Sequence, residues 1–296
     1  LADIIHRQNL PPGTFNLVLG SGSQVGNALI HSSQIHGLSF TGSVEIGRKV
    51  AVATAPNFVR CQLEMGSKNA LVIAEDADIQ IAVEATIAGS FSGTGQKCTA
   101  SSRLVVMDRI HDQYVDALLK RLAEIKVGHA LEEGVFMGPV VDENQLNADL
   151  SWVEKVRQSS AELAFGGERL QLKHEGYYMS PTLFLNTQNS WDVNQEEVFA
   201  PMACVMRVAD LDEAVSVVND TRFGLTSGII TKNLRDSAIF KQQAQTGCVM
   251  VNLPTAGTDY HVPFGGRKES SFGPREQGQY AKEFYTVVKT AYQRPY

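Results

Sequence analysis

The stretch FSGTGQKC, residues Phe91–Cys98, ends an apolar helical pattern with glycines, small residues and a single cysteine. Glycine lets the backbone turn sharply and come close to a bound molecule. A thiol in such a loop is reachable, and its thiolate is a strong nucleophile. The alternative is a buried structural cysteine after the end of a helix, because free cysteine is among the most buried residue types.

A carboxylate upstream favours the reactive alternative. Glu64 ends an apolar, strand-like run at residues 59–63, and Gly66 follows it. A thiol and a carboxylate that each lie in a glycine-containing turn can serve as nucleophile and general base. We therefore predict that Cys98 and Glu64 are the catalytic residues of an enzyme.

The composition is that of a soluble globular protein. Of the 296 residues 43 % are apolar and 20 % are charged, and the net charge of −6 gives no electrostatic reason to bind nucleic acid or an anionic membrane. No apolar run reaches the roughly 18 residues that span a bilayer. The cysteines show no C-x-x-C spacing, which predicts a reducing, cytoplasmic compartment. The histidines form no HExxH or Cys/His cluster, so we expect no metal site.

Strand-like and helical patterns alternate along the chain. Apolar runs rich in β-branched residues predict strands at residues 15–19, 38–41, 59–63, 70–74, 103–107, 203–208, 226–231 and 248–252. Between them, apolar residues recur at helical spacing, most clearly at residues 78–91 and 115–125. This alternation indicates an α/β fold with a mostly parallel sheet that is covered on both faces.

One strand–helix junction has the character of an anion site. Gly42 and Ser43 follow the strand at residues 38–41 and precede a helix over residues 44–54. Ser43 suits the N-cap, and the start of a helix presents unpaired N–H groups to an anion. Gly47 would allow either close packing or the close approach of a ligand. Simple helix capping is the alternative, and it requires only Ser43.

The last residues form a different pattern. From Lys282 onward the side chains alternate like those of an exposed strand, as at Phe284, Thr286 and Val288, and nothing follows that could pair with them inside the chain. An unpaired strand tends to find a partner. We therefore predict that the protein is an oligomer.

Five ordered motifs resemble the signatures of the aldehyde dehydrogenase superfamily. They are FTGS at Phe40–Ser43, EMGSK at Glu64–Lys68, GQKC at Gly95–Cys98, EEVFAP at Glu196–Pro201 and PFGGRK at Pro263–Lys268. The resemblance extends over essentially the whole chain and corresponds to the C-terminal three-fifths of a family member. Residues 95–103 and 260–292 look most like those of the α-ketoglutaric semialdehyde dehydrogenases.

The resemblance implies a catalytic domain with a mostly parallel sheet, an incomplete Rossmann-like cofactor domain and a C-terminal oligomerisation strand. The expected bounds are residues 1–66 for the partial cofactor domain, 67–263 for the catalytic domain and 264–296 for the return segment and tail. We expect the N-terminal part of a family member, with its first cofactor-sheet strands and an oxyanion asparagine, to have no counterpart here. NAD or NADP as cofactor and a homo-oligomer, dimer or tetramer, are further implications.

The implied reaction oxidises an aldehyde, in particular a semialdehyde of an oxo acid, to the carboxylic acid. The Cys98 thiolate would attack the carbonyl to give a thiohemiacetal, nicotinamide would take a hydride, and Glu64 would activate the water that hydrolyses the thioester. The backbone N–H of Cys98 is an expected oxyanion donor, and Lys97 is expected to lower the pKa of the thiol. Two alternatives are transfer of the acyl group to coenzyme A, which Glu64 argues against, and a non-catalytic remnant that only binds partner subunits.

The resemblance also implies cofactor contacts. Gly42, Ser43 and Gly47 would lie against the pyrophosphate. Glu197 would accept hydrogen bonds from the nicotinamide ribose, and a solvated surface charge is the alternative for this residue. Phe199 would line the cofactor, although phenylalanine is more often a core residue.

For the aldehyde, the resemblance implies a pocket lined by Phe264, which has the same alternative as a core residue. Arg103 would either attract an acidic substrate or lie where a helix meets the sheet. The sequence departs from the family pattern at Ala200, where glycine is usual, and at Glu269, where a small residue is usual. Neither departure falls on a catalytic position.

Overall fold

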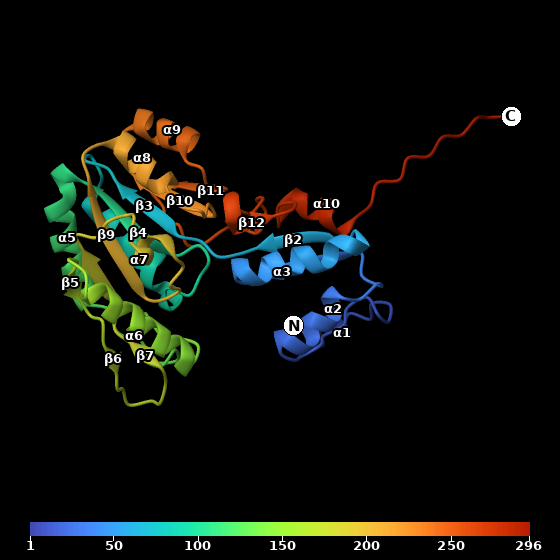
Figure 1. Cartoon of the computed structure of the whole chain (residues 1–296), viewed down its shortest axis with the longest axis horizontal. Helices are drawn as coiled ribbons and strands as arrows, with labels where there is room; N and C mark the ends of the chain where they lie inside the picture. The colour runs from blue at the N-terminus through green and yellow to red at the C-terminus, as the bar shows by residue number, and fades with distance from the viewer.

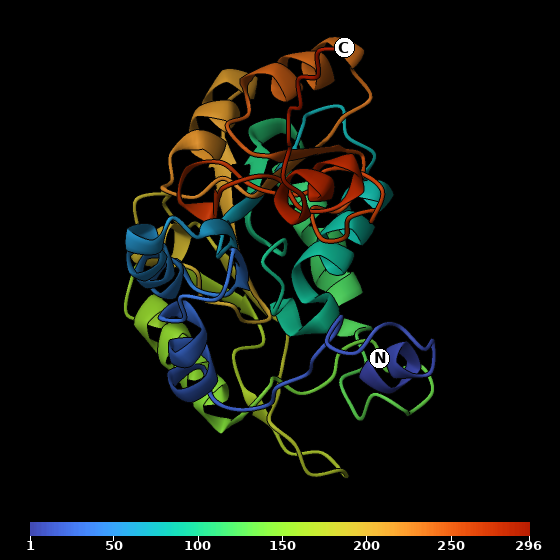
Figure 2. The same ribbon diagram turned by 90° about the vertical axis from the view of Figure 1, so that its right-hand side faces the viewer.

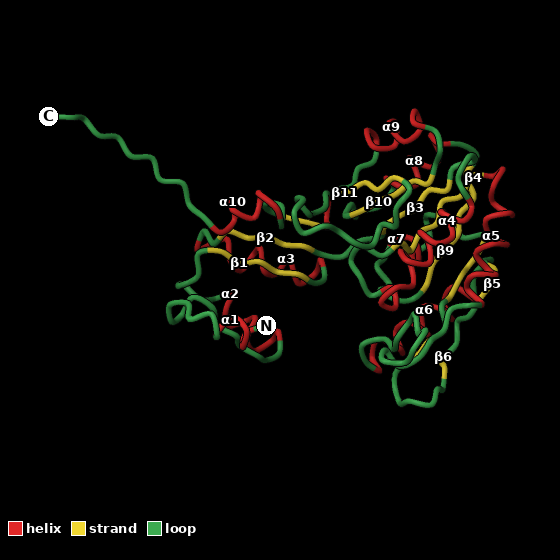
Figure 3. The backbone as a smooth tube through the Cα atoms, turned by 180° about the vertical axis from the view of Figure 1, so that it is seen from behind, coloured by secondary structure: helices red, strands yellow, loops and turns green.

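The structure, a computed structural model, describes residues 1–296. Its strands form a large sheet, a small sheet and a two-stranded hairpin, and the large and small sheets stand side by side in Figures 1 and 3. The helices are α1 (Ala2–His6), α2 (Asn27–Ile30), α3 (Val44–Thr54), α4 (Ile79–Thr86), α5 (Asp108–Ala123), α6 (Glu143–Arg157), α7 (Asp192–Gln195), α8 (Leu211–Asn219), α9 (Leu234–Gln243) and α10 (Ala281–Tyr285). No helix combines the length and the apolar character that crossing a membrane requires.

The large sheet has seven strands in the order β11, β10, β3, β4, β9, β8 and β5. Their bounds are β3 (Asn69–Ile73), β4 (Ser101–Met107), β5 (Glu162–Phe165), β8 (Thr182–Leu185), β9 (Met202–Val208), β10 (Thr226–Ile230) and β11 (Cys248–Val251). Every neighbouring pair is parallel except β5 with β8. The prediction of a mostly parallel sheet is therefore confirmed.

Helices cover both faces of the large sheet because side chains of a strand point alternately to opposite sides. Leu71 and Ile73 of β3 pack in one buried cluster with α4 and α5, whereas Ala70 and Val72 pack in another with α8 and α9. A third cluster joins α6 to β8 and β9. Continuous apolar runs in β3 and β4 are the expected pattern for strands buried on both faces.

The small sheet contains β1 (Gly37–Thr41), β2 (Arg60–Glu64) and β12 (Ser271–Phe272). Strands β1 and β2 are parallel, and β12 pairs antiparallel with β2. Helix α3 packs on β2 through Val50, Leu63 and Met65. A separate short hairpin is formed by β6 (Arg169–Leu170) and β7 (Tyr178–Met179). The chain passes from the small sheet to the large one between Glu64 and Asn69, and we call residues 65–68 the crossover turn.

Two predicted strands are absent. Residues 15–19 contain four exposed apolar side chains and form no strand, so β1 remains the edge of the small sheet. At the other end, residues 281–285 form α10 instead of the start of a strand, and residues 286–296 pair with no strand. Figure 1 shows this tail leaving the body of the protein, and in Figure 2 its end faces the viewer.

Arg103 of β4 is buried, with 1 % of its surface exposed. Its Nε donates to the carbonyl of Lys68 at 3.0 Å, and its Nη1 and Nη2 donate to the carbonyls of Val217 at 2.8 Å and Val218 at 3.0 Å. Nη1 also donates to Asn189 Oδ1, and burial lowers the pKa of the guanidinium to about 10. The prediction of a substrate contact for Arg103 is therefore wrong, because its donors tie β4 to the crossover turn and to the end of α8.

Replacing Arg103 by methionine should lower the free energy of unfolding by about 3–5 kcal/mol, because three buried carbonyls lose their donor. The matched control is Arg109→Met, since Arg109 is 81 % exposed and pairs only with Glu75 on the surface. We expect the control to change stability by less than about 0.5 kcal/mol. Denaturant unfolding followed by circular dichroism measures both, and equal stabilities for the two variants would contradict this account of Arg103.

Candidate active site

Glu64 lies at the end of β2, where both sheets come close to the start of α3. Its side chain is buried, and Ser271 of β12 donates a hydrogen bond from Oγ to Glu64 Oε2 at 2.5 Å. The backbone N–H of Gly42 donates to the carbonyl of Glu64 at 3.1 Å. The predicted base and the predicted anion site are therefore neighbours.

Cys98 follows a tight reversal of the chain. After α4 the helix continues as a π-helical turn over Ile87–Phe91, and Gly93, Thr94 and Gly95 then all have positive φ angles of 60–65°. A Cβ atom on Gly95 would lie 2.2 Å from the carbonyl oxygen of Ala200, so only glycine fits there. This reversal brings Cys98 back to the cavity between the two sheets, where it is half-buried.

Both predicted catalytic residues line a single open cavity of about 700 Å³. Its wall also contains five of the residues to which the sequence assigned binding roles, namely Gly42, Ser43, Glu197, Phe199 and Phe264. Phe199 is 36 % exposed, whereas Phe264 is 7 % exposed and pairs through its backbone with Glu276. The structure thus brings together the thiol, the carboxylate and most of the expected binding residues.

Burial has the largest effect on the pKa of the Glu64 carboxyl group. It raises the pKa of Glu64 to about 7, while the hydrogen bond from Ser271 opposes the rise. The carboxylate of Glu276 raises this pKa further, and the guanidinium of Arg275 lowers it. A carboxyl group with a pKa of about 7 exchanges protons readily at neutral pH, which suits a general base.

The pKa of the Cys98 thiol is also raised, which favours the neutral form. Burial, followed by the negative charges of Glu197 and Glu64, raises the pKa of Cys98 to about 11. The backbone N–H groups of Cys98 and Thr99 act in the opposite direction. The prediction that Lys97 lowers this pKa is not met, because the Lys97 ammonium donates to Ser92 Oγ at 3.1 Å. The thiol must therefore lose its proton to a base when it reacts.

Glu197 is held against the crossover turn. The N–H of Ser67 donates to Glu197 Oε1 at 3.0 Å, and a Cβ atom on Gly66 would lie 2.1 Å from Glu197 Oε2. Burial raises the pKa of this carboxyl group. Glu197 is therefore a fixed, half-buried group that faces the cavity, and the alternative of a solvated surface charge is wrong.

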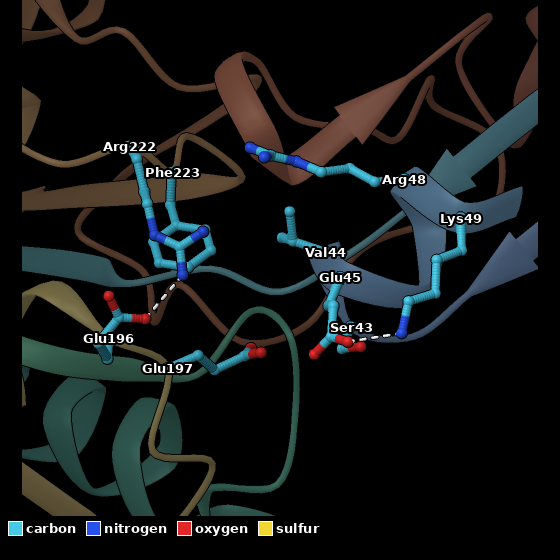
Figure 4. Close-up of a pocket in the computed structure, with 9 residues that line it drawn as sticks. All are labelled: Ser43, Val44, Glu45, Arg48, Lys49, Glu196, Glu197, Arg222 and Phe223. Carbon is cyan, nitrogen blue, oxygen red and sulfur yellow. Dashed lines mark hydrogen bonds and ion pairs between the residues drawn. The ribbon is translucent and has the colours of Figure 1, made fainter. Parts of the chain in front are cut away.

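A second hollow of about 500 Å³ lies between α3 and the segment that carries Glu197 (Figure 4). Ser43 accepts a hydrogen bond from the N–H of Ile46 at 3.3 Å, so it caps α3 as predicted. Across the hollow, Arg222 pairs with Glu196 at 2.7 Å. The first turn of α3 and the fixed carboxylate of Glu197 thus face the same space.

The two departures from the family pattern have structural partners. Glu269 pairs with Arg222 at 2.7 Å and also with Arg48 of α3, so this acidic residue joins α3 to the segment opposite. The carbonyl of Ala200 touches Gly95, as described above. Sequence reasoning did not identify Arg222 or Arg48, because an arginine by itself carries no signal for a partner far away in the chain.

Gly47 does not line the cavity. A Cβ atom at this position would lie 2.3 Å from Met65 Sδ, so the glycine allows α3 to pack closely on the end of β2. The structure thus shows close packing at Gly47, and the cofactor contact stays a prediction.

Sequence reasoning also missed Ser271 and Ser67. Their partners, Glu64 and Glu197, are distant in sequence, and a lone serine does not indicate such a contact.

Comparisons with known proteins give the same assignment as the geometry. The sequence matches the aldehyde dehydrogenase family over residues 1–291. It is 41 % identical over 288 residues to an α-ketoglutaric semialdehyde dehydrogenase of Bacillus subtilis, covering 97 % of this chain and 59 % of that protein. It is 38 % identical over 296 residues to a 2,5-dioxopentanoate dehydrogenase of Saccharolobus solfataricus, covering 99 % of this chain and 61 % of that protein.

Solved structures extend the likeness to the fold. The betaine aldehyde dehydrogenase of Staphylococcus aureus in complex with NAD+ superimposes with a TM-score of 0.93 at 31 % sequence identity, over 97 % of this chain and 57 % of that one. The chain therefore spans about three-fifths of the length of these relatives. Together, the sequence match and the shared fold show that the chain belongs to the aldehyde dehydrogenase family.

Proposed function

We propose that this chain is the catalytic region of an NAD(P)-dependent aldehyde dehydrogenase that oxidises an aldehyde to the carboxylic acid. The observation that carries the proposal is the shared cavity of Cys98 and Glu64, with the fixed carboxylate of Glu197 beside them. A nucleophile, a base of suitable pKa and a binding surface are the parts that this reaction needs.

In the proposed reaction, Glu64 is the base and Cys98 is the nucleophile. Glu64 takes the proton of the Cys98 thiol as the sulfur attacks the aldehyde carbon, and a thiohemiacetal forms. The backbone N–H of Cys98 stabilises the oxyanion. Loss of a hydride leaves a thioester on Cys98. Glu64 first releases the proton of the thiol to solvent and then removes a proton from water, which attacks the thioester. The acid leaves, and Glu64 returns its proton to the expelled sulfur, which restores the thiol.

Nicotinamide, when bound, supplies the hydride acceptor, and the residues present fit such a cofactor. The capped N-terminus of α3 at Gly42 and Ser43 offers N–H groups to the pyrophosphate. Glu197 can accept hydrogen bonds from the ribose hydroxyls, and Phe199 lies beside it. An apolar groove of about 610 Å³ between α2 and α3, lined by Leu29, Ile30, Leu38, Phe40, Ile46 and Val50, suits the adenine end.

The role of Glu64 as the base is tested by Glu64→Gln. This variant lacks the base for both the attack and the hydrolysis, so turnover should fall at least about 100-fold, the usual effect of losing a general base. Formation of acid and of reduced cofactor measures this loss, and a Cys98→Ala control, which lacks the nucleophile, should form neither. In the unmodified chain, activity should fall as the pH drops below about 7, because Glu64 becomes protonated. Unchanged turnover in Glu64→Gln would overturn the assignment.

Product analysis separates hydrolysis from the alternative acyl transfer. With coenzyme A present, the proposed reaction still yields the free acid. A non-catalytic remnant would form neither the acid nor reduced cofactor.

For the substrate we propose a semialdehyde of an oxo acid, the class named for the two relatives above. Such a substrate carries a carboxylate at the end remote from the aldehyde. Lys97 is the only cationic residue in the wall of the cavity, and none of the ion pairs in the structure involves it. A carboxylate about 4 Å from its ammonium would gain on the order of 1–4 kcal/mol.

Lys97→Gln tests this substrate assignment. With 5-oxopentanoate as an anionic probe, KM should rise about tenfold, which corresponds to about 1.4 kcal/mol. With pentanal, the neutral aldehyde of equal length, KM should change less than twofold. Lys120→Gln, an exposed lysine on α5, is the charge-matched control. Equal changes for both aldehydes would contradict the role of Lys97.

We propose in addition that the chain assembles as a homo-oligomer through its tail. Val287, Val288 and Tyr292 are 82 %, 91 % and 95 % exposed, and the outer edge of β11 has no neighbouring strand. An exposed apolar segment and an open sheet edge each favour pairing with another copy.

Removing residues 286–296 should lower the mass measured by sedimentation equilibrium to that of a smaller assembly or a monomer. Val52→Ser is the control, because Val52 is 74 % exposed on α3, away from the tail, and should leave the mass unchanged. An unaltered mass after the deletion would exclude the tail as the contact.

A further inference from the structure

Asn69, the first residue of β3, is 2 % exposed and makes four hydrogen bonds. Its Nδ2 donates to the carbonyls of Cys98 and Ala100, each at 2.8 Å. Its Oδ1 accepts from Ser67 Oγ at 2.7 Å and from the N–H of Thr226 at 3.0 Å. Carbonyls only accept and a backbone N–H only donates, so these partners fix which way the amide points.

These bonds restrain the peptide group that follows the nucleophile. The carbonyl of Cys98 and the N–H of Thr99 belong to one planar trans peptide, so they point in opposite directions. Holding the carbonyl against Asn69 therefore directs the N–H to the other side, where the sulfur lies. The next peptide is also restrained, because the carbonyl of Thr99 accepts from Thr255 Oγ1 at 2.8 Å.

We propose that Asn69 is a positioning residue that aims the Thr99 N–H at the Cys98 sulfur, where it stabilises the thiolate. The inference rests on the proposed role of Cys98 as nucleophile. It agrees with the downward effect of the Thr99 N–H on the pKa of the thiol. An aspartate at position 69 could not replace the amide, since its oxygen would face two carbonyl oxygens.

The test is the alkylation rate of Cys98 by iodoacetamide at a fixed pH near 8, followed by peptide mass spectrometry. Asn69→Leu keeps the approximate shape but removes all four bonds, and it should slow alkylation about three- to tenfold. A rise of one pKa unit lowers the thiolate fraction tenfold, and the greater nucleophilicity of a more basic thiolate offsets part of this loss. Asn69→Ser keeps one donor and should fall between Asn69→Leu and the unmodified chain.

Two controls separate positioning from general loosening. Asn252→Leu removes a similar clamp, in which the Asn252 side chain bonds the backbone of Thr231 outside the cavity, and it should not slow Cys98. Cys248 is a second half-buried thiol, and its rate should stay unchanged in the Asn69 variants.

An Asn69→Leu chain that folds and alkylates Cys98 as fast as the unmodified chain would overturn the proposal. If Asn69→Leu does not fold, a normal Cys98 rate in Asn69→Ser overturns it equally. Alkylation needs neither aldehyde nor cofactor. A slowed thiol in a chain that never reduces cofactor would therefore support Asn69 while contradicting the proposed dehydrogenase activity.

Discussion

The crossover turn, residues 65–68, is the constraint on which the site depends, because it joins the two sheets and carries no regular structure of its own. A buried turn requires partners for each of its polar backbone groups. The N–H of Met65 donates to the carbonyl of Ser270 at 2.8 Å, and Ser270 Oγ donates to the carbonyl of Gly66 at 2.8 Å. The carbonyl of Lys68 accepts from Arg103, and the N–H of Ser67 donates to Glu197. Fixing the turn fixes the base at one end and Asn69 at the other.

The close packing around the crossover turn also affects the pKa values of the acidic groups in the cavity. Three acidic groups, Glu64, Glu197 and the Cys98 thiol, share one partly dry cavity, and burial raises the pKa of each. Negative charge on one group disfavours negative charge on the others, so their protons are linked. In the proposed reaction, a proton passes from the Cys98 sulfur to the Glu64 carboxylate as the sulfur attacks the carbonyl.

The sequence predicted most of this framework because periodic patterns report local burial. Apolar runs identified β3, β4, β9, β10 and β11 of the large sheet, and glycine-rich turns identified Cys98 and Glu64 as candidates. Arg103 was misassigned because its charge suggests a surface or a ligand, whereas its true partners are backbone carbonyls that leave no mark in a sequence. Asn69 and Ser271 were missed because their roles depend on contacts between distant segments. Residues 15–19 show the converse, a strand-like pattern that forms no strand in the structure.

The chain of charges from Arg48 through Glu269 and Arg222 to Glu196 has a consequence for the ionic environment. These side chains lie at the rim of the hollow between α3 and the Glu197 segment and remain partly exposed, with 32–64 % of each side chain accessible. Exposed pairs weaken as dissolved ions screen them over a Debye length of about 8 Å at physiological salt. The spacing between α3 and its opposite wall should therefore respond to salt, while the buried contacts of the crossover turn are screened from it.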